Sequence, residues 1–371
     1  MEHSGVSENF KNLEIHSLIC NRDVVMAINN FKSLQKYEEF KNVPIYLHDD
    51  GSLTDIDVSL LSDIKNVTFI DRKWADSEIE KFIKNHPNCL SYRLGPSKIN
   101  LWHKIKSFDY YFFSESKNIL GVDTDLLFMR RPSNVISLIE SGTPFYFPDV
   151  QSSYSFNEPK NEIPVLKNVN TGLIYIPSEK YYSLDDIEFA LSNLIRNNVN
   201  YFPSWIEQSA YAHMFYKNEK YVSLSVDKYR IPYFQGVDIE TVECLHFVSY
   251  PAVRDTYEQY TEYLKFDNGV LLYKSKFFVD FEDNEIPLII QIFRHENFYS
   301  MKYYWGLEET NQNFLDHMFK LETSEGEIIK KFQSNKNGFF IFKTLNDSIK
   351  IEHTYEWYGK TDWKDLGLIY L

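Results

Sequence analysis

The chain has 371 residues, of which 17% are aromatic, and its 53 acidic residues outnumber its 39 basic ones, for a formal net charge of −14. So many bulky apolar side chains exclude intrinsic disorder, because burying them offsets the conformational entropy lost on folding. The acidic balance argues against nucleic acid as a partner, since phosphate binding needs a basic face and no run of Lys and Arg occurs. The length suits two domains.

The three cysteines, Cys20, Cys89 and Cys244, lie far apart in the chain and form neither a disulfide framework nor a zinc-binding pair. We expect them to be buried thiols in a reducing compartment. The first residues show no export signal, and no apolar stretch approaches the ~20 residues of a membrane-spanning helix. The sequence thus predicts a soluble, cytoplasmic protein with no transmembrane segment.

The first part of the chain alternates strand-like and helix-like segments. The apolar pattern predicts strands over 13–20, 43–48, 67–70 and 118–123, with helices over 23–37, from 54, over 76–86 and over 97–108. Thr54 and Asp57 are spaced as a capping box for the second helix. This order predicts an α/β fold with a mostly parallel central sheet and helices on both faces.

The middle of the chain is less regular, and the last part changes character. Strands are expected over 169–177 and 242–249, and helices over 183–196, 204–215 and 255–264. From residue 277 short strand-like runs dominate, and the turn residues Ser334 to Gly338 predict a hairpin. We therefore expect a domain over 1–275 and a small antiparallel β-rich accessory domain of open role over 276–371.

Asp123 and Asp125 directly follow the apolar segment Asn118 to Val122. In an open α/β sheet ligands bind at the carboxyl ends of the strands, and paired carboxylates there suit a hard divalent cation that bridges substrate phosphates. The Asp-x-Asp pattern also occurs at Asp55 and Asp57, where it is expected only to start a helix. Location, and not the pattern alone, singles out the pair after the strand.

Five short motifs, in order, resemble those of GT-A glycosyltransferases, which use nucleotide-diphosphate sugars. Val122–Pro132 is similar to their metal-binding DxD segment, and His48–Thr54 resembles a strand-turn of a group of bacterial sugar-transferase-like proteins. Asn170–Leu173 and Glu207–Gln208 resemble further motifs of that group, and also features of retaining glycogenin-like and lipopolysaccharide galactosyltransferase-like enzymes. His246 matches in order the histidine that often completes the metal site. The resemblance covers roughly residues 13–270. It implies a GT-A, Rossmann-like fold.

The resemblance also implies site residues. Asp123 and Asp125 would bind Mn²⁺ or Mg²⁺ and His246 would complete the metal site, although a histidine packed at a strand end is the alternative. Asn170, Glu207 and Gln208 would lie beside the sugar as catalytic residues. Glu207 has a second interpretation, because Ser204 and Glu207 are spaced as a capping box.

The ends of the first two strands are expected to hold the nucleotide. The residues at those ends are Cys20, Asn21, Arg22, Asp49 and Asp50, and Asp123 is expected to contact the donor as well. Ordinary turn chemistry is the alternative for Asp49 and Asp50. Lys98, Lys104 and Arg254 are candidates for the phosphates, and a solvated surface position is the alternative for these three. Arg72 and Arg93, each in a connection, are candidates for the sugar or the phosphates.

The sequence predicts a metal-dependent glycosyltransferase that transfers a hexose-type sugar from a nucleotide donor, with UDP and retention of anomeric configuration favoured. The acceptor, a glycan, a protein or a small molecule, is open. The chain departs from the family after His246, where it lacks a His-x-x-Gly-x-x-Lys-Pro-Trp segment. A dehalogenase-type phosphatase is disfavoured by Leu127, where that class has Thr or Val. A non-catalytic carbohydrate-binding protein or a degenerate transferase is the other alternative.

Overall fold

The computed structural model describes two compact units, one of residues 1–231 with 243–248 and one of residues 232–242 with 249–371. Within these units the described residues are 7–95, 102–150, 154, 163–196, 205–232, 237, 241–248, 257, 260, 261, 264, 270–281, 284–294, 299–305, 316–323, 326–333, 338–342, 348–357, 360–361 and 364–370. Among the described helices, none is both long and apolar enough to cross a membrane. The domain boundary expected at 275/276 stays a prediction.

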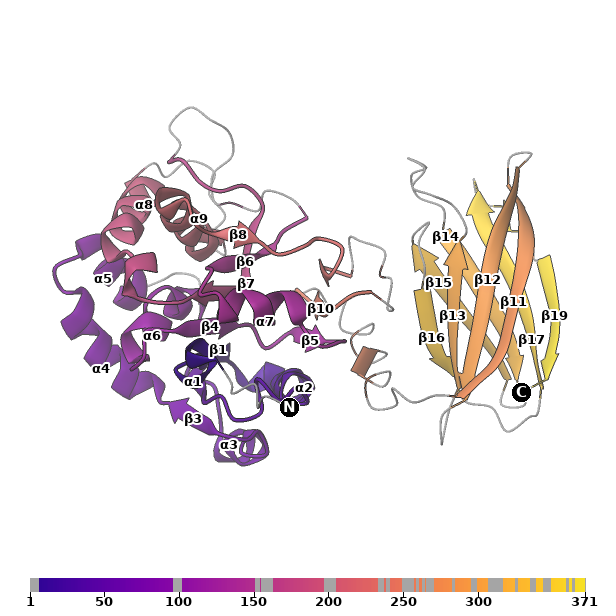
Figure 1. Cartoon of the computed structure of the whole chain (residues 1–371), viewed down its shortest axis with the longest axis horizontal. Coiled ribbons are helices and arrows are strands. Elements are labelled where there is room, and N and C mark those ends of the chain that lie inside the picture. Colours follow the sequence, from indigo (N-terminus) through magenta and orange to yellow (C-terminus); the bar gives the residue numbers. More distant parts are fainter. Residues whose placement is uncertain are drawn as a thin grey trace. The chain divides into compact units, whose positions relative to one another are not determined.

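The first unit is built on a seven-stranded sheet (Figure 1). Its strands, in spatial order, are β3 (Val67–Ile70), β2 (Ile45–Asp49), β1 (Glu14–Ile19), β4 (Ile119–Val122), β7 (Val169–Ile176), β6 (Phe145–Pro148) and β8 (Val222–Ser223). β1 pairs in parallel with both β2 and β4, and β2 with β3, whereas β7 runs antiparallel to β4 and β6. The strand order reverses between β1 and β4, and such a reversal opens a crevice at the carboxyl ends.

A second, three-stranded sheet lies against the first. It has the order β5 (Leu126–Phe128), β10 (Cys244–His246) and β9 (Tyr229–Arg230). β5 follows β4 after a turn of only three residues, Asp123 to Asp125, and pairs antiparallel with β10. The turn therefore carries the chain from the main sheet directly onto the second one.

Helices cover both faces of the main sheet, as predicted. They are α1 (Glu8–Lys11), α2 (Val24–Leu34), α3 (Asp55–Leu61), α4 (Arg72–Ile83), α5 (Pro87–Leu94), α6 (Lys106–Phe113), α7 (Ser133–Glu140), α8 (Leu184–Arg196) and α9 (Ile206–Asn218), with short 3₁₀ turns η1 (Asn21–Asp23), η2 (Trp102–Ile105) and η3 (Glu179–Tyr181). Successive strand residues point to opposite faces, so neighbours such as Ile119 and Leu120 enter different cores.

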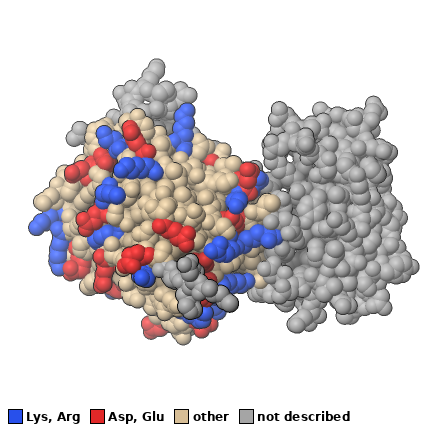
Figure 2. Space-filling view, viewed as in Figure 1, with Lys and Arg blue, Asp and Glu red and all other residues tan. Residues whose placement is uncertain are grey.

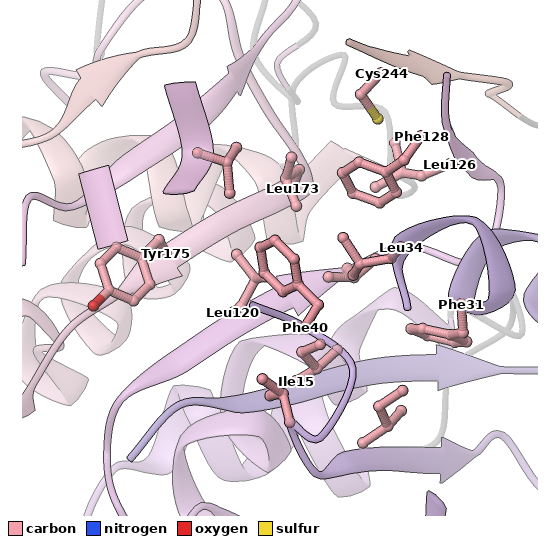
Figure 3. Close-up of a cluster of buried hydrophobic side chains, with 14 of the residues drawn as sticks. Ile15, Phe31, Leu34, Phe40, Leu120, Leu126, Phe128, Leu173, Tyr175 and Cys244 are labelled. Atoms are coloured by element: carbon pink, nitrogen blue, oxygen red, sulfur yellow. The ribbon is translucent and has the colours of Figure 1, made fainter. Parts of the chain in front are cut away.

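The two cores separate the helices into two layers. One core packs α2 and α7 against the sheet, with Phe31, Leu34 and Ile139 among its buried side chains; Figure 3 shows it. The other packs α4, α6, α8 and α9 against the opposite face, with Phe108 and Phe215 fully buried. The predicted α/β class with a mostly parallel sheet is confirmed.

Helix starts follow their capping residues. Thr54 accepts from the Asp57 backbone N–H and Asp57 accepts from Thr54 in return, so the predicted capping box is present. Asp71 caps α4 by accepting from the Trp74 backbone N–H at 2.8 Å, so this helix starts at Arg72 and not at residue 76 as predicted. The first part of the helix expected over 97–108, residues 97–101, lies outside the described residues. From Trp102 the chain forms η2 and then α6, which continues to Phe113, and aromatic residues of α6 pack in the core on that face of the sheet.

The second unit contains antiparallel sheets. One has the order β11 (Val270–Phe281), β12 (Asn284–Arg294), β13 (Tyr299–Trp305) and β16 (Gly338–Phe342); the other has β15 (Gly326–Gln333), β14 (Asp316–Thr323), β17 (Ser348–Trp357) and β18 (Lys360–Thr361), with β19 (Lys364–Tyr370) also on β17. Ile290, Ile292 and Met301 are fully buried and share one face of the first sheet. That face is therefore a core face.

The predicted hairpin at Ser334–Gly338 is wrong. β15 ends at Gln333 and β16 begins at Gly338, but the two strands belong to different sheets. β15 pairs with β14 and β16 pairs with β13. Turn residues indicate where the chain can reverse, and the partner of each strand is decided by the packing of its apolar face.

Candidate metal and sugar-donor site

The Asp123–Asp125 turn joins the two sheets at the crevice beside β1 and β4. The Asp123 backbone N–H donates to the Gly172 carbonyl of β7 at 2.7 Å, and the Phe247 backbone N–H donates to the Asp125 carbonyl at 2.8 Å. Antiparallel pairing of β5 with β10 places His246 opposite Leu126. Three segments far apart in the chain therefore meet at this turn.

Asp123, Asp125 and His246 form a cluster of potential metal ligands. One ligand atom from each residue lies within 4.8 Å of the others. His246 Nε2 is 3.1 Å from Asp125 Oδ1 and 3.9 Å from Asp123 Oδ2. The His246 imidazole faces the buried Asp125 Oδ1. Two carboxylates and an imidazole nitrogen this close together can bind one cation between them.

The donor set fits Mn²⁺ or Mg²⁺. Carboxylates suit both hard cations, and an imidazole among them is better tolerated by Mn²⁺. Burial lowers the pKa of His246, but Asp125 and Asp123 outweigh it and raise the pKa above its ordinary value. Burial likewise opposes the charge on Asp123, yet Lys106 and His246 lower the pKa of this carboxyl. The negative charges of Asp123 and Asp125 are therefore partly balanced by Lys106 and His246, and the ligand atoms of the two carboxylates lie close to the His246 ring.

Gly172 makes room for the histidine. A Cβ atom at this position would lie 2.3 Å from His246 Cε1 and 2.7 Å from Nδ1. No real Cβ contact is that short, so any larger residue would push the ring away from the carboxylates. The glycine of the Asn-Thr-Gly segment is thus explained by close packing against His246.

Lys106, Glu207 and Thr171 form a second buried cluster next to the metal ligands. Lys106 Nζ donates to Asp123 Oδ1 at 2.7 Å and lies 3.9 Å from Glu207 Oε1. Thr171 Oγ1 donates to Glu207 Oε2 at 3.1 Å. Burial raises the pKa of Glu207 to about 7, and Asp123 adds to this while Lys106 opposes it. Glu207 therefore titrates near neutral pH.

The Glu207 carboxylate is directed to Thr171 and Lys106. Its Oε1 makes no hydrogen bond to the described residues. Trp205 occupies the N-cap position of α9 and, within the described part of the chain, makes no side-chain capping hydrogen bond. Ser204, the other member of the expected capping box, lies outside the described residues, so the capping interpretation stays a prediction.

The other two sugar-side candidates are buried nearby. Asn170 Oδ1 accepts from the Gly172 backbone N–H at 2.8 Å, and Asn170 Nδ2 donates to Asp149 Oδ2 at 3.3 Å. This amide therefore shapes the strand end on which His246 packs. Gln208 follows Glu207 on α9 and is also buried.

The residues expected to hold the nucleotide lie together at the ends of β1 and β2. Cys20 Sγ donates to Asp23, Arg22 pairs with Asp23 at 3.2 Å, and the Asn21 backbone N–H donates to Ser52 Oγ at 2.9 Å. Burial and Asp23 raise the pKa of Cys20 to about 12, so this thiol is not reactive at neutral pH.

Asp49 and Asp50 are engaged in the turn that follows β2. Asp49 Oδ1 accepts from the Gly51 backbone N–H at 2.8 Å and Asp50 Oδ1 accepts from the Ser52 backbone N–H at 2.9 Å. Gly51 itself has φ +97°, which favours glycine. These contacts are the turn chemistry given above as the alternative to a ligand role.

The basic candidates divide into three groups. Lys98 and Arg254 lie outside the described residues. Arg72 and Arg93 lie in α4 and α5 and not in connections, because Asp71 caps one helix and Pro87 begins the other. Both arginines pair with Asp76. Burial lowers the pKa of Lys104, and Arg72 and Arg93 lower it further, so it belongs to that arginine cluster.

Two residues of the site were missed from the sequence. Lys106 is the first residue of α6 and is buried, but no local pattern distinguishes it from a surface lysine. Asn30 lies in α2 and its Nδ2 donates to the Asp123 carbonyl at 2.7 Å. No local pattern marks an asparagine in a helix as a partner of a turn 93 positions away.

Neither the family models nor the curated proteins contain a match to this chain. Solved structures similar to it include mouse xyloside xylosyltransferase 1 (10% identity, TM-score 0.41, 64% of this chain and 98% of that one). Two others are the galactosyltransferase LgtC with donor and acceptor sugar analogues (12%, TM-score 0.43, 68% and 95%) and the mannosyltransferase Ktr4p of S. cerevisiae with GDP (12%, TM-score 0.38, 68% and 80%). These three similar structures are named as glycosyltransferases.

Proposed function

We propose that this protein is a metal-dependent glycosyltransferase that transfers a hexose-type sugar from a nucleotide-diphosphate donor. The observation that carries the proposal is the convergence of Asp123, Asp125 and His246 at the carboxyl end of β4, with Lys106 and Glu207 beside them. A cation held by two carboxylates and an imidazole suits a diphosphate, because the ion is the largest local positive charge that a donor would meet.

Asp123, Asp125 and His246 would hold Mn²⁺ or Mg²⁺. The bound cation would neutralise the diphosphate and stabilise it as a leaving group. Lys106 keeps Asp123 ionised and directed toward the crevice through its 2.7 Å hydrogen bond. The protein contributes to this chemistry by holding two carboxylates and a histidine close together in the absence of a ligand.

Glu207 is proposed to act on the sugar side of the site. Its Oε1 makes no hydrogen bond to the described residues, and a pKa of about 7 allows it to hold or release a proton near neutral pH. It would orient a sugar hydroxyl or accept the proton of the acceptor. Asn170 and Gln208 are proposed to contact the same sugar.

The nucleotide is proposed to lie at the ends of β1 and β2. Cys20, Asn21 and Arg22 line the end of β1 beside the crevice, and Asp49 and Asp50 form the neighbouring turn. Lys98 and Arg254 are proposed to contact the phosphates. UDP and retention of anomeric configuration are favoured by the motifs that resemble retaining enzymes, and the acceptor is a glycan, a protein or a small molecule.

A donor screen tests the proposal. We expect the protein to hydrolyse UDP-sugars slowly in the presence of Mn²⁺, and we expect Asp123→Ala and Asp125→Ala each to abolish this activity with the fold intact. Asp55→Ala is the matched control, because it removes an exposed carboxylate from the other Asp-x-Asp segment and should leave the activity unchanged.

Two results would contradict the proposal in different ways. Calorimetry that finds neither UDP-sugar nor GDP-sugar binding in the presence of Mn²⁺ would exclude a nucleotide-sugar enzyme. Donor binding without any hydrolysis or transfer would favour the non-catalytic carbohydrate-binding alternative. Circular dichroism of each variant checks that a loss of activity is not a loss of structure.

A further inference from the structure

Two buried polar side chains of α2 face the turn that carries the metal ligands. Asn30 and Ser33 are 0% and 2% exposed, and the other buried residues of this helix are apolar. Burying an amide and a hydroxyl in such surroundings is unfavourable unless they are hydrogen-bonded. Their contacts should therefore explain why this helix has them.

Asn30 and Ser33 hold opposite ends of the 123–128 segment. Asn30 Nδ2 donates to the Asp123 carbonyl at 2.7 Å. Ser33 Oγ accepts from the Phe128 backbone N–H at 3.0 Å and donates to the Asn30 carbonyl at 2.7 Å. The helix thus binds the first residue of the turn and the last residue of β5.

The contact of Asn30 is the one that reaches a metal ligand. The backbone N–H of Asp123 donates to Gly172, and its carbonyl accepts from Asn30, so the peptides on both sides of this residue are held. A fixed backbone restricts the positions open to the Asp123 carboxylate, which lies next to His246 and Lys106. Ser33 holds β5 three residues beyond Asp125, away from the carboxylates.

We infer that Asn30 is a positioning residue for the metal site, and that its amide sets the affinity for the divalent cation by fixing the backbone of Asp123. This inference rests on the proposed function, because it assumes that Asp123 is a metal ligand. Loss of a group that hydrogen-bonds to a metal ligand, without binding the metal itself, typically weakens metal affinity about 10–100-fold. The same helix begins beside Asn21 and Arg22, so the expected nucleotide end and the metal ligand share one rigid element.

Asn30→Leu and Ser33→Ala separate positioning from general packing. Both variants remove one buried hydrogen bond between α2 and the same segment, but only Asn30→Leu frees the peptide between Asp123 and Thr124. We expect the Kd for Mn²⁺ alone, measured by calorimetry, to rise about 10–100-fold in Asn30→Leu and to change by less than about threefold in Ser33→Ala. Urea unfolding without metal gives the stability of each variant.

Hydrogen exchange gives a second measurement that needs no metal. We expect the backbone amides of Asp123 and Phe247, which donate to the Gly172 and Asp125 carbonyls, to exchange faster in Asn30→Leu than in Ser33→Ala, at matched overall stability. If Asn30→Leu does not fold, Asn30→Ser takes its place, because a serine hydroxyl is too short to reach the Asp123 carbonyl from this position.

The outcomes distinguish this inference from the proposed function. Equal weakening of Mn²⁺ binding in both variants, or unchanged binding and unchanged exchange in Asn30→Leu, would overturn the role of Asn30. If the natural protein and Asp125→Ala bind Mn²⁺ equally, the proposed metal site itself is wrong, whatever Asn30 does. In that case the exchange of the Asp123 and Phe247 amides still decides whether Asn30 holds the turn.

Discussion

Glu207 combines burial with a charge, and this combination has a measurable cost. The carboxyl is 3% exposed, and its pKa is raised to about 7 from an ordinary 4.5, with burial as the largest cause. Between these two values the folded protein keeps a proton that the unfolded chain has already lost. The free energy of unfolding therefore falls as the pH rises from 4.5 to 7, and the loss is complete above 7.

We predict that Glu207→Gln stabilises the protein at pH 8 and impairs transfer. An amide has no charge to bury, so the free energy of unfolding should rise by up to about 3 kcal/mol at pH 8, at about 1.4 kcal/mol per pKa unit, and should hardly change at pH 4. Removing a group that handles a proton lowers the rate about 10²–10⁴-fold. Urea unfolding at both pH values and an activity assay measure the two effects. A variant that is no more stable at pH 8 would show that Glu207 is not a destabilising buried charge.

At the scale of elements, α6 connects the site with the helix layer. Lys106 at its first turn donates to Asp123, and Asp109 one turn later accepts from Arg93 of α5 at 2.8 Å and 2.7 Å. Tyr110 accepts from the Leu18 backbone N–H of β1 at 2.7 Å. Helix α6 is thus held to β1, to the turn after β4 and to α5. Arg93 contributes the contact with α5 by donating to Asp109.

Arg93→Met should destabilise the protein without affecting the metal site. Arg93 and Asp109 are 0% and 1% exposed, and removing one partner of a buried ion pair costs about 3–5 kcal/mol. The double variant Arg93→Met/Asp109→Leu should regain much of this loss, because two apolar residues leave no unpaired charge. Denaturant unfolding and Mn²⁺ calorimetry test this. Normal stability together with weakened UDP-sugar binding would instead make Arg93 a donor ligand.

At the scale of the whole molecule, acidic residues outnumber basic ones. On the face that Figure 2 shows, Lys and Arg alternate with Asp and Glu over the described residues, with no extended patch of one sign. The net charge of −14 would repel an anionic donor. Under the proposed function, affinity for a diphosphate would therefore be local, through a cation held by Asp123, Asp125 and His246.

The division into two compact units predicts two thermal transitions. The first unit has two cores around its sheet, and the second has its own buried face with Ile290, Ile292 and Met301. Mn²⁺ at about 100 times its Kd should stabilise only the first unit, by about 3 kcal/mol, and raise that transition by roughly 5–10 °C. Scanning calorimetry with Asp125→Ala as the control checks this. One transition that moves as a whole would mean that the two units unfold together.

Local patterns predicted much of the fold. The strand over 67–70 is found at those residues as β3, and Thr54 caps α3 as its spacing to Asp57 predicted. An apolar run indicates which faces of a strand or helix are buried, and a capping residue hydrogen-bonds to backbone groups of the same helix end. Strands and helix starts can therefore be predicted from residues close together in the chain. The errors at the start of α4 and at Ser334–Gly338 arise where a cap was overlooked and where strand pairing is a long-range choice.

The sequence by itself determined an α/β fold and a carboxylate pair at the end of an apolar strand, because both depend on residues close together in the chain. The motif resemblance named His246 as a third ligand, but only the tertiary structure decided that His246, Lys106 and Asn30 reach that pair. His246 packs on Gly172, Lys106 donates to Asp123, and Asn30 holds the Asp123 carbonyl. These contacts depend on the order of β1, β4 and β7 in the sheet and on the pairing of β5 with β10. Such pairings bring distant segments together, and no local periodicity encodes them.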